Sequence, residues 1–129
     1  MGFWDLKTLK LDEFRPGIRS KLESGTNLTM AFMEIAPNKE GVIHDHPFDQ
    51  CGVVIEGEIE MSIEEEKKLM RSMETYFIPA GAKHNWKTFS SSTRILDVVA
   101  KQSEDAVAYL LYFPQFFDIN CFAFPTLIW

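Results

Sequence analysis

Three histidines and one glutamine are spaced so that their side chains could bind a metal ion. His44 and His46 are two residues apart, Gln50 follows four residues later, and His84 comes from a distant segment. Residues i and i+2 of an extended strand point to the same face, so the two nearby imidazoles should converge. Imidazole nitrogens and an amide oxygen suit borderline divalent metals such as Zn, Ni, Fe or Mn. We therefore predict one divalent metal ion bound by His44, His46, Gln50 and His84.

Two further residues are candidates for proton transfer at such a site. Asp97 follows Leu96 in a run of β-forming residues and could act as a general acid or base if it faces the metal. Its alternative role is a salt bridge with Arg94 or Lys101. Tyr76 could donate a proton, or it could simply fill the end of the core. We take Asp97 and Tyr76 as the candidate catalytic residues.

Three other residues are candidates for substrate binding. Arg19 could bind a substrate carboxylate through two parallel hydrogen bonds, although an arginine on the surface would look the same in the sequence. Gly52 shares the strand face of Gln50 and could leave room for a substrate, or it could fill a narrow part of the interior. Trp86 shares the face of His84 and could stack on a ligand ring or pack in the core.

Short segments rich in β-forming residues should position these side chains. Turn residues separate them at intervals of about ten residues, which is typical of a β-sandwich or barrel. The expected strands cover residues 28–35, 50–55, 58–63, 75–78, 84–88 and 94–100. The charged run 64–68 is expected to be the tip of a hairpin, and Pro79-Ala80-Gly81 should form a tight turn that aims His84 into the interior.

Together these segments resemble the two sequence motifs of the cupin superfamily. The first motif reads His44-x-His46 with Gln50 and Gly57, and the second reads Pro79-x-Gly81-x-x-His84. The resemblance implies an all-β fold, a single-domain cupin with a double-stranded β-helix or jelly-roll barrel. It covers residues 28–100.

The chain departs from the usual motifs at three positions. Gln50 replaces the usual glutamate ligand, Met73 occupies the place of a glycine before the second motif, and Thr88 stands where an asparagine is usual. A neutral amide leaves the site one charge more positive than a carboxylate would, which makes a bound metal a stronger Lewis acid. The neutral amide ligand also makes the site less suited to stabilising high-valent iron.

The string around the first motif resembles the small pectin-degradation (KdgF-type) cupins. The resemblance implies a site of three histidines and a glutamine that converts unsaturated uronates into linear keto sugars, and Leu96-Asp97-Val98 matches an aspartate placed in that family's mechanism. We therefore expect redox-neutral isomerisation, ring opening or cyclisation of a small sugar-acid-like or keto substrate. A non-catalytic sensory cupin that binds a small molecule, and an iron-dependent dioxygenase, remain the alternatives.

Composition limits the other classes of function. The 129-residue chain has a net charge of −6 and a pI of about 5.0, so no nucleic-acid partner is expected. We expect one domain over residues 1–129: an N-terminal strand extension over 1–27, then the motif core, and a short C-terminal helix with an apolar tail over 103–129. Two cysteines and no apolar leader predict a cytoplasmic protein.

The apolar tail allows two interpretations. It is long enough to suggest a membrane anchor, but Pro114, Asp118, Asn120 and Pro125 interrupt it, so membrane association is not expected. Small cupins pair as homodimers, and the resemblance implies the same here. The tail and the apolar N-terminal strand from Phe3 to Phe14 are the expected interface.

Overall fold

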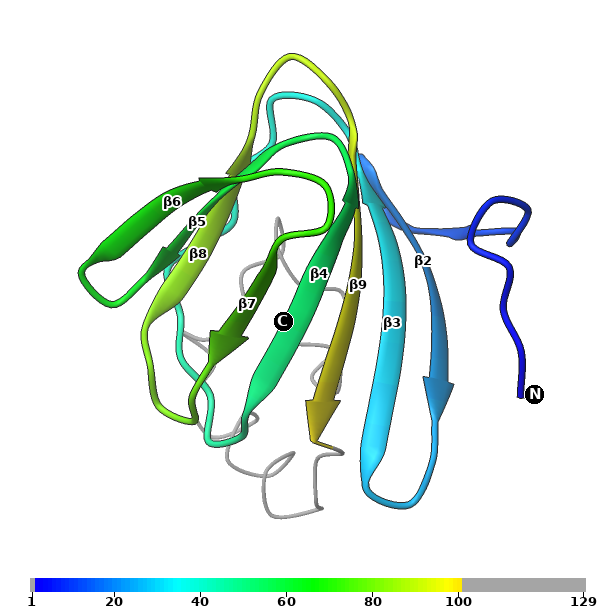
Figure 1. Cartoon of the computed structure of the whole chain (residues 1–129), viewed down its shortest axis with the longest axis horizontal. Coiled ribbons are helices and arrows are strands. Elements are labelled where there is room, and N and C mark those ends of the chain that lie inside the picture. The colour runs from blue at the N-terminus through cyan, green and yellow to red at the C-terminus, as the bar shows by residue number, and fades with distance from the viewer. Residues whose placement is uncertain (1, 101–129) are drawn as a thin grey trace.

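Two antiparallel sheets face each other across the core (Figure 1). The computed structural model describes residues 2–100. The larger sheet has the strand order β1 (Asp12–Arg15), β2 (Ile18–Ser24), β3 (Leu28–Ile35), β9 (Thr93–Ala100), β4 (Gln50–Glu56), β7 (Thr75–Ile78). The smaller sheet has the order β6 (Glu66–Met70), β5 (Ile59–Ile63), β8 (His84–Thr88). This all-β arrangement confirms the predicted cupin barrel, and residues 2–100 contain no helix.

The expected strands agree with the structure at most described positions and differ near the N-terminus and at one hairpin. Strands β3, β7 and β8 have the predicted bounds. The charged run 64–68 is not only a hairpin tip, because Glu66 begins strand β6. The N-terminal strand is also shorter than expected: Phe3 is 98% exposed, and the first strand begins only at Asp12. The predicted C-terminal helix and the apolar tail lie outside the described residues.

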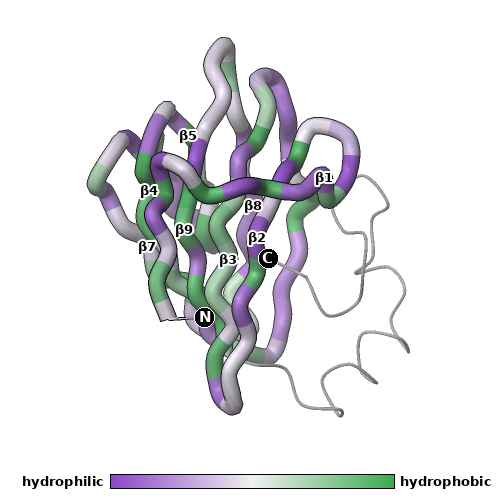
Figure 2. Tube along the Cα trace, turned by 90° about the vertical axis from the view of Figure 1, so that its right-hand side faces the viewer, coloured by the Kyte–Doolittle hydropathy of each residue, from purple (hydrophilic) through white to green (hydrophobic). Residues whose placement is uncertain are grey.

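Alternation along the strands separates the core from the outer surface (Figure 2). In β9, Thr93, Ile95, Asp97 and Val99 are buried, whereas the residues between them are only half-buried. Asp97 therefore faces the interior between two aliphatic neighbours. A carboxyl group at such a position needs hydrogen-bond partners, because an unpartnered buried charge is costly.

One turn and one bridge bring the distant histidines together. The amide of Ala82 donates to the Pro79 carbonyl over 3.0 Å, and Gly81 has φ +83°, so the predicted Pro-x-Gly turn is formed. His44 and His84 then exchange backbone hydrogen bonds of 2.9 and 3.1 Å. This isolated bridge is the only β-pairing of His44 in the described chain, so the two-residue histidine spacing lies in a loop rather than in a strand.

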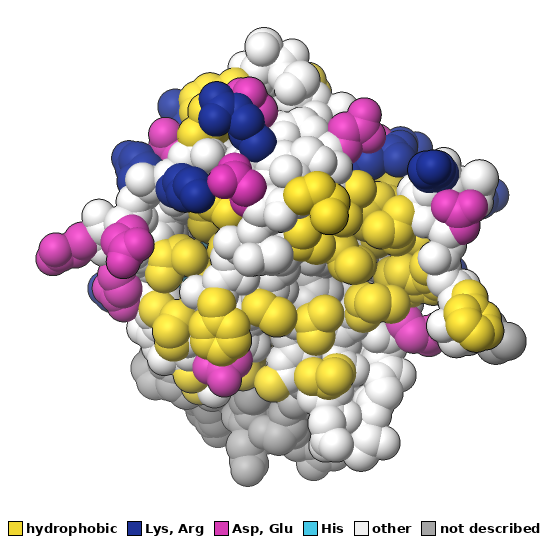
Figure 3. All heavy atoms as spheres, in the orientation of Figure 1, with side chains coloured by type: hydrophobic (Ala, Val, Ile, Leu, Met, Phe, Trp, Pro, Cys, Tyr) yellow, Lys and Arg dark blue, Asp and Glu magenta, His cyan; other side chains and the backbone are white. Residues whose placement is uncertain are grey.

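The outer surface is partly apolar. Figure 3 shows hydrophobic side chains across the middle of one face, with charged side chains mainly around its rim. Phe77, on the edge strand β7, is 60% exposed. Among residues 2–100, no helix is long and apolar enough to cross a membrane.

Candidate metal centre and adjoining pocket

Three buried histidines converge from one loop and one strand. His44, His46 and His84 are 5%, 1% and 2% exposed, and their ligand atoms all lie within 4.8 Å of one another. The ring centroids of His44 and His84 are 4.3 Å apart, and those of His46 and His84 are 4.8 Å apart. The three side chains therefore form a group that could hold a metal ion.

Backbone carbonyls fix the tautomer of each ring. The Nδ1 atoms of His44, His46 and His84 lie 2.8, 2.9 and 2.8 Å from the carbonyls of Val42, Phe48 and Ala82. A carbonyl only accepts, so each Nδ1 carries the hydrogen and a neutral ring has its lone pair on Nε2. In metal-binding histidines, the ring nitrogen that does not bind the metal usually donates to such a backbone carbonyl.

Burial keeps two of these rings neutral. It lowers the pKa of His84 to about 3, with a further contribution from the neighbouring His44, and it lowers the pKa of His46. The Nε2 atom of His84 is buried and makes no hydrogen bond with the described residues. A buried acceptor of this kind calls for a cation or a proton, so the residues fit a metal ion.

Gln50 completes the group from the first residue of β4. Its Oε1 lies 3.0 Å from His46 Nε2, and its Nε2 donates to Asp97 Oδ2 over 2.8 Å. The carboxylate of Asp97 thus turns the amide oxygen toward the imidazole. With His46 Nδ1 protonated, two acceptors face each other, and a cation between them would relieve the repulsion.

Asp97 and Tyr76 form a second buried pair beside Gln50. The Tyr76 hydroxyl donates to Asp97 Oδ1, and both residues are buried. Burial raises the pKa of Asp97 to about 7, although hydrogen bonds from Tyr76 and Gln50 favour its ionised form. Burial and the adjacent Asp97 raise the pKa of Tyr76 well above its ordinary value, so the hydroxyl keeps its proton.

Gly52 makes the space for this pair. A Cβ at residue 52 would overlap the Asp97 carboxylate and the Tyr76 ring carbon and hydroxyl. Gly52 pairs with Tyr76 on one side and with Asp97 on the other, so its missing side chain lets the two partners meet across β4. The glycine does not itself line the adjoining pocket.

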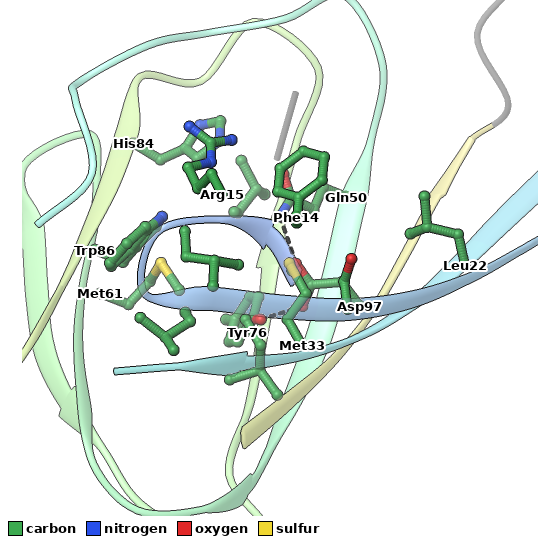
Figure 4. A pocket seen from close by; sticks show the side chains of 15 residues that line it. Phe14, Arg15, Leu22, Met33, Gln50, Met61, Tyr76, His84, Trp86 and Asp97 are labelled. Carbon is green, nitrogen blue, oxygen red and sulfur yellow. Dashed lines mark hydrogen bonds between the residues drawn. The ribbon is translucent and has the colours of Figure 1, made fainter. Parts of the chain in front are cut away.

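A pocket lies directly against these residues (Figure 4). We call it the barrel pocket, and its polar lining consists of Arg15, Ser20, Gln50, Tyr76, His84 and Asp97. Its remaining lining is apolar and includes Phe14, Met33 and Trp86. The chain of β1 and the turn into β2 passes over the pocket in Figure 4.

The candidate substrate-binding residues differ in their relation to this pocket. Trp86 is half-buried and lines it, and the ring also packs so closely on Gly41 that a Cβ there would come within 2.8 Å. Arg19 lies on the outer face, where it pairs with Glu34, and it does not line the pocket. Arg15, which sequence reasoning missed, does line it and is 8% exposed.

Thr88, in strand β8 of the smaller sheet, forms hydrogen bonds with the start of the loop that carries His44 and His46. Its hydroxyl donates to the Ala36 carbonyl over 2.8 Å and accepts from the Lys39 amide over 2.9 Å. The threonine therefore fixes the segment that leads to His44, at the position where cupins usually have asparagine.

Solved structures with the same fold are numerous, and three show how far the likeness extends. KdgF from Halomonas sp. has 21% identity and a TM-score of 0.70, covering 81% of this chain and 97% of that one. An RmlC-like cupin from Shewanella frigidimarina has 18% identity and a TM-score of 0.70, covering 81% and 95%. TT1209 from Thermus thermophilus has 26% identity and a TM-score of 0.68, covering 78% and 97%.

A family model, as well as the fold, identifies the family of this chain, although no individual curated protein sequence matches it. The model of the cupin domain matches residues 31–99, more than half of the chain, and this segment includes the three histidines, Gln50 and Asp97. With its two facing sheets and its group of three histidines, the chain belongs to the cupin family.

Proposed function

We propose that this cupin is a metal-dependent enzyme that binds one divalent ion through His44, His46, Gln50 and His84. The observation that carries the proposal is the orientation of Gln50, whose amide oxygen faces the lone pair of His46 at 3.0 Å. Asp97 holds that orientation from the opposite side. Zn, Ni, Fe and Mn all suit this donor set.

The reaction we propose is a redox-neutral isomerisation, ring opening or cyclisation of a small sugar-acid-like or keto substrate. The chemistry that a divalent ion held by these residues would supply is polarisation of a carbonyl or hydroxyl oxygen. Asp97 lines the barrel pocket and is the residue proposed to take up and return the substrate proton. The Tyr76 hydroxyl donates a hydrogen bond to Asp97 and so positions the carboxylate for this transfer. Trp86 forms one wall for the substrate.

Elemental analysis of tag-free protein tests the metal site. We expect about one equivalent of a divalent metal in the wild type and its loss in His84→Ala, because that change removes a ligand. Asn85→Ala, the neighbouring position on β8, is the matched control and should keep the metal. A metal-free protein that cannot be reloaded would contradict the proposal and leave a non-catalytic binding cupin.

The identity of the metal and the use of oxygen separate the two enzymatic alternatives. Zn or Ni without oxygen uptake supports redox-neutral chemistry. Iron together with oxygen consumption would favour the dioxygenase. We also propose a homodimer, as the cupin resemblance implies, and light scattering coupled to size exclusion measures it directly.

A further inference from the structure

The barrel pocket combines one cationic side chain with a mainly apolar wall. Arg15 is 8% exposed, and its Cζ lies 4.7 Å from the centroid of the Phe14 ring. Both side chains come from the edge strand β1, and Figure 4 shows them beside the other pocket residues. The guanidinium therefore lines the same pocket as His84 and Asp97, which are the residues nearest the proposed chemistry.

A local irregularity in β1 accompanies this placement of the arginine. The pairing of β1 with β2 shifts register between Glu13 and Arg15. Bulges of this kind re-aim side chains and are common next to functional sites. Arg19, on the neighbouring strand, instead alternates with the inward-facing Ile18 and Ser20, and it lies outside the pocket.

The apolar wall restricts what the arginine could hold. Phe14 and Trp86 present aromatic rings, and Leu22, Met33 and Met61 add aliphatic or thioether surface. A polyhydroxylated sugar acid would bury several hydroxyl groups here, and each one left without a partner weakens binding. An aromatic or alkyl chain would instead gain from the same surface.

The guanidinium of Arg15 and the net charge of the chain together indicate the charge of the ligand. A guanidinium matches a carboxylate through two parallel hydrogen bonds. The chain has a net charge of −6, which disfavours ligands with several negative charges. A monocarboxylate fits both conditions.

We infer that the barrel pocket binds an apolar monocarboxylic acid, aromatic or alkyl, whose carboxylate is held by Arg15 while its chain packs against Phe14 and Trp86. The inference rests on the function proposed above, because the substrate would occupy this pocket. Within that function it selects an apolar keto acid over a sugar acid. Arg15 is then a substrate-binding residue.

Calorimetric titration with three simple probes tests this assignment without requiring turnover. The probes are 3-phenylpropionate, its uncharged analogue 3-phenylpropanamide, and D-galacturonate. In the wild-type protein as purified, we expect the phenyl acid to bind at least tenfold more tightly than either of the other two. Equal or tighter binding of the amide or of galacturonate would overturn the inference, and this comparison needs no variant.

Single substitutions then test whether Arg15 is the residue that binds the carboxylate. Arg15→Gln should weaken 3-phenylpropionate binding at least tenfold and leave 3-phenylpropanamide binding unchanged. Arg71 is an exposed arginine that pairs with Glu58 and does not line the pocket. Arg71→Gln is therefore the matched control and should bind both probes as the wild type does. Unchanged phenyl-acid binding in Arg15→Gln, or a loss in Arg19→Gln instead, would overturn the role of Arg15.

Failure of the proposed function would look different. If the protein holds no metal but binds 3-phenylpropionate through Arg15, the pocket assignment stands and the metal-dependent reaction fails. If the metal is present and galacturonate binds more tightly than the phenyl acid, the metal site stands and the apolar substrate class fails.

Discussion

The Gln50 amide donates to the Asp97 carboxylate over 2.8 Å, so residue 50 is a hydrogen-bond donor toward one neighbour while its amide oxygen faces His46 Nε2. A glutamate, the usual cupin residue at this position, could not donate to Asp97 while ionised, because a carboxylate only accepts. It would also place a second negative charge against Asp97. The pair thus gives a structural reason why glutamine occupies a position where other cupins have a ligand carboxylate.

Exchanging the amide for a carboxylate should therefore destabilise the protein. In the presence of a chelator, we expect Gln50→Glu to lower the free energy of unfolding by about 2–3 kcal/mol, because a buried donor is replaced by a like charge. Adding Asp97→Asn restores a donor between the two side chains and should recover about half of the loss. Urea denaturation measures both effects, and a double variant no more stable than Gln50→Glu would argue against the pair.

Gly52 should tolerate no side chain. Gly52→Ala places a methyl group on the Asp97 carboxylate and the Tyr76 ring, and overpacking of this kind costs about 1–3 kcal/mol. Gly25→Ala is the matched control, since the nearest atom to its new Cβ would be the Leu28 carbonyl at 3.9 Å. Thermal unfolding of the two variants gives the comparison. Equal melting temperatures would mean that the Tyr76–Asp97 pair is not rigidly held.

Replacing Met73 with glycine should stabilise the folded protein. The methionine is 79% exposed and has φ +72°, a left-handed conformation that is unfavourable for residues with a Cβ. We expect Met73→Gly to raise the free energy of unfolding by about 0.5–1 kcal/mol. Met73→Ala, which keeps the Cβ but removes the rest of the side chain, should stay close to the wild type. Equal effects of the two changes would exclude backbone strain as the cause.

Glu34 should contribute stability that depends on pH. Partial burial alone would raise the pKa of Glu34, but hydrogen bonds from Arg19 and Arg94 lower it below its ordinary value of 4.5. Because the folded-state pKa is the lower one, the contribution is complete above about pH 5 and is lost as the pH falls through the folded-state pKa.

The test is Glu34→Gln, followed by denaturant unfolding at two pH values. We expect a loss of about 1 kcal/mol at pH 7 and almost none near pH 2.5, as for a small surface charge network. Glu60→Gln removes only a long contact with Lys67 of 3.8 Å and serves as the control. A loss of the same size at both pH values would show that packing, rather than charge, explains the effect.

The sequence predicted the central strands and the histidine group well, because both depend on local patterns. Strands such as Leu28–Ile35 and Thr75–Ile78 consist of β-forming residues bounded by turn residues, and their bounds were predicted correctly. Strand β2 was missed because its outward positions are Arg19, Lys21 and Glu23, and its inward positions include only two aliphatic residues, Ile18 and Leu22. Strand β6 was hidden in the same way by exposed charges.

The position of Arg15 could not be predicted from the sequence. It depends on the register shift in β1 and on the path of that strand over the pocket, and neither leaves a signal in the residues themselves. The histidine pair illustrates the opposite case. Its convergence was anticipated from strand geometry, yet the structure reaches it through a loop that pairs with β8 by two isolated bridges, Glu40 with Lys87 and His44 with His84.

The bridge between His44 and His84 joins the connection between β3 and β4 to the first residue of β8. His44 lies between two strands of the larger sheet, His84 begins a strand of the smaller sheet, and the two residues exchange two backbone hydrogen bonds. A cation bound by both rings would act as a cross-link, comparable to a disulfide, that stabilises only the closed chain. Metal supply would then set the lifetime of this protein against proteolysis.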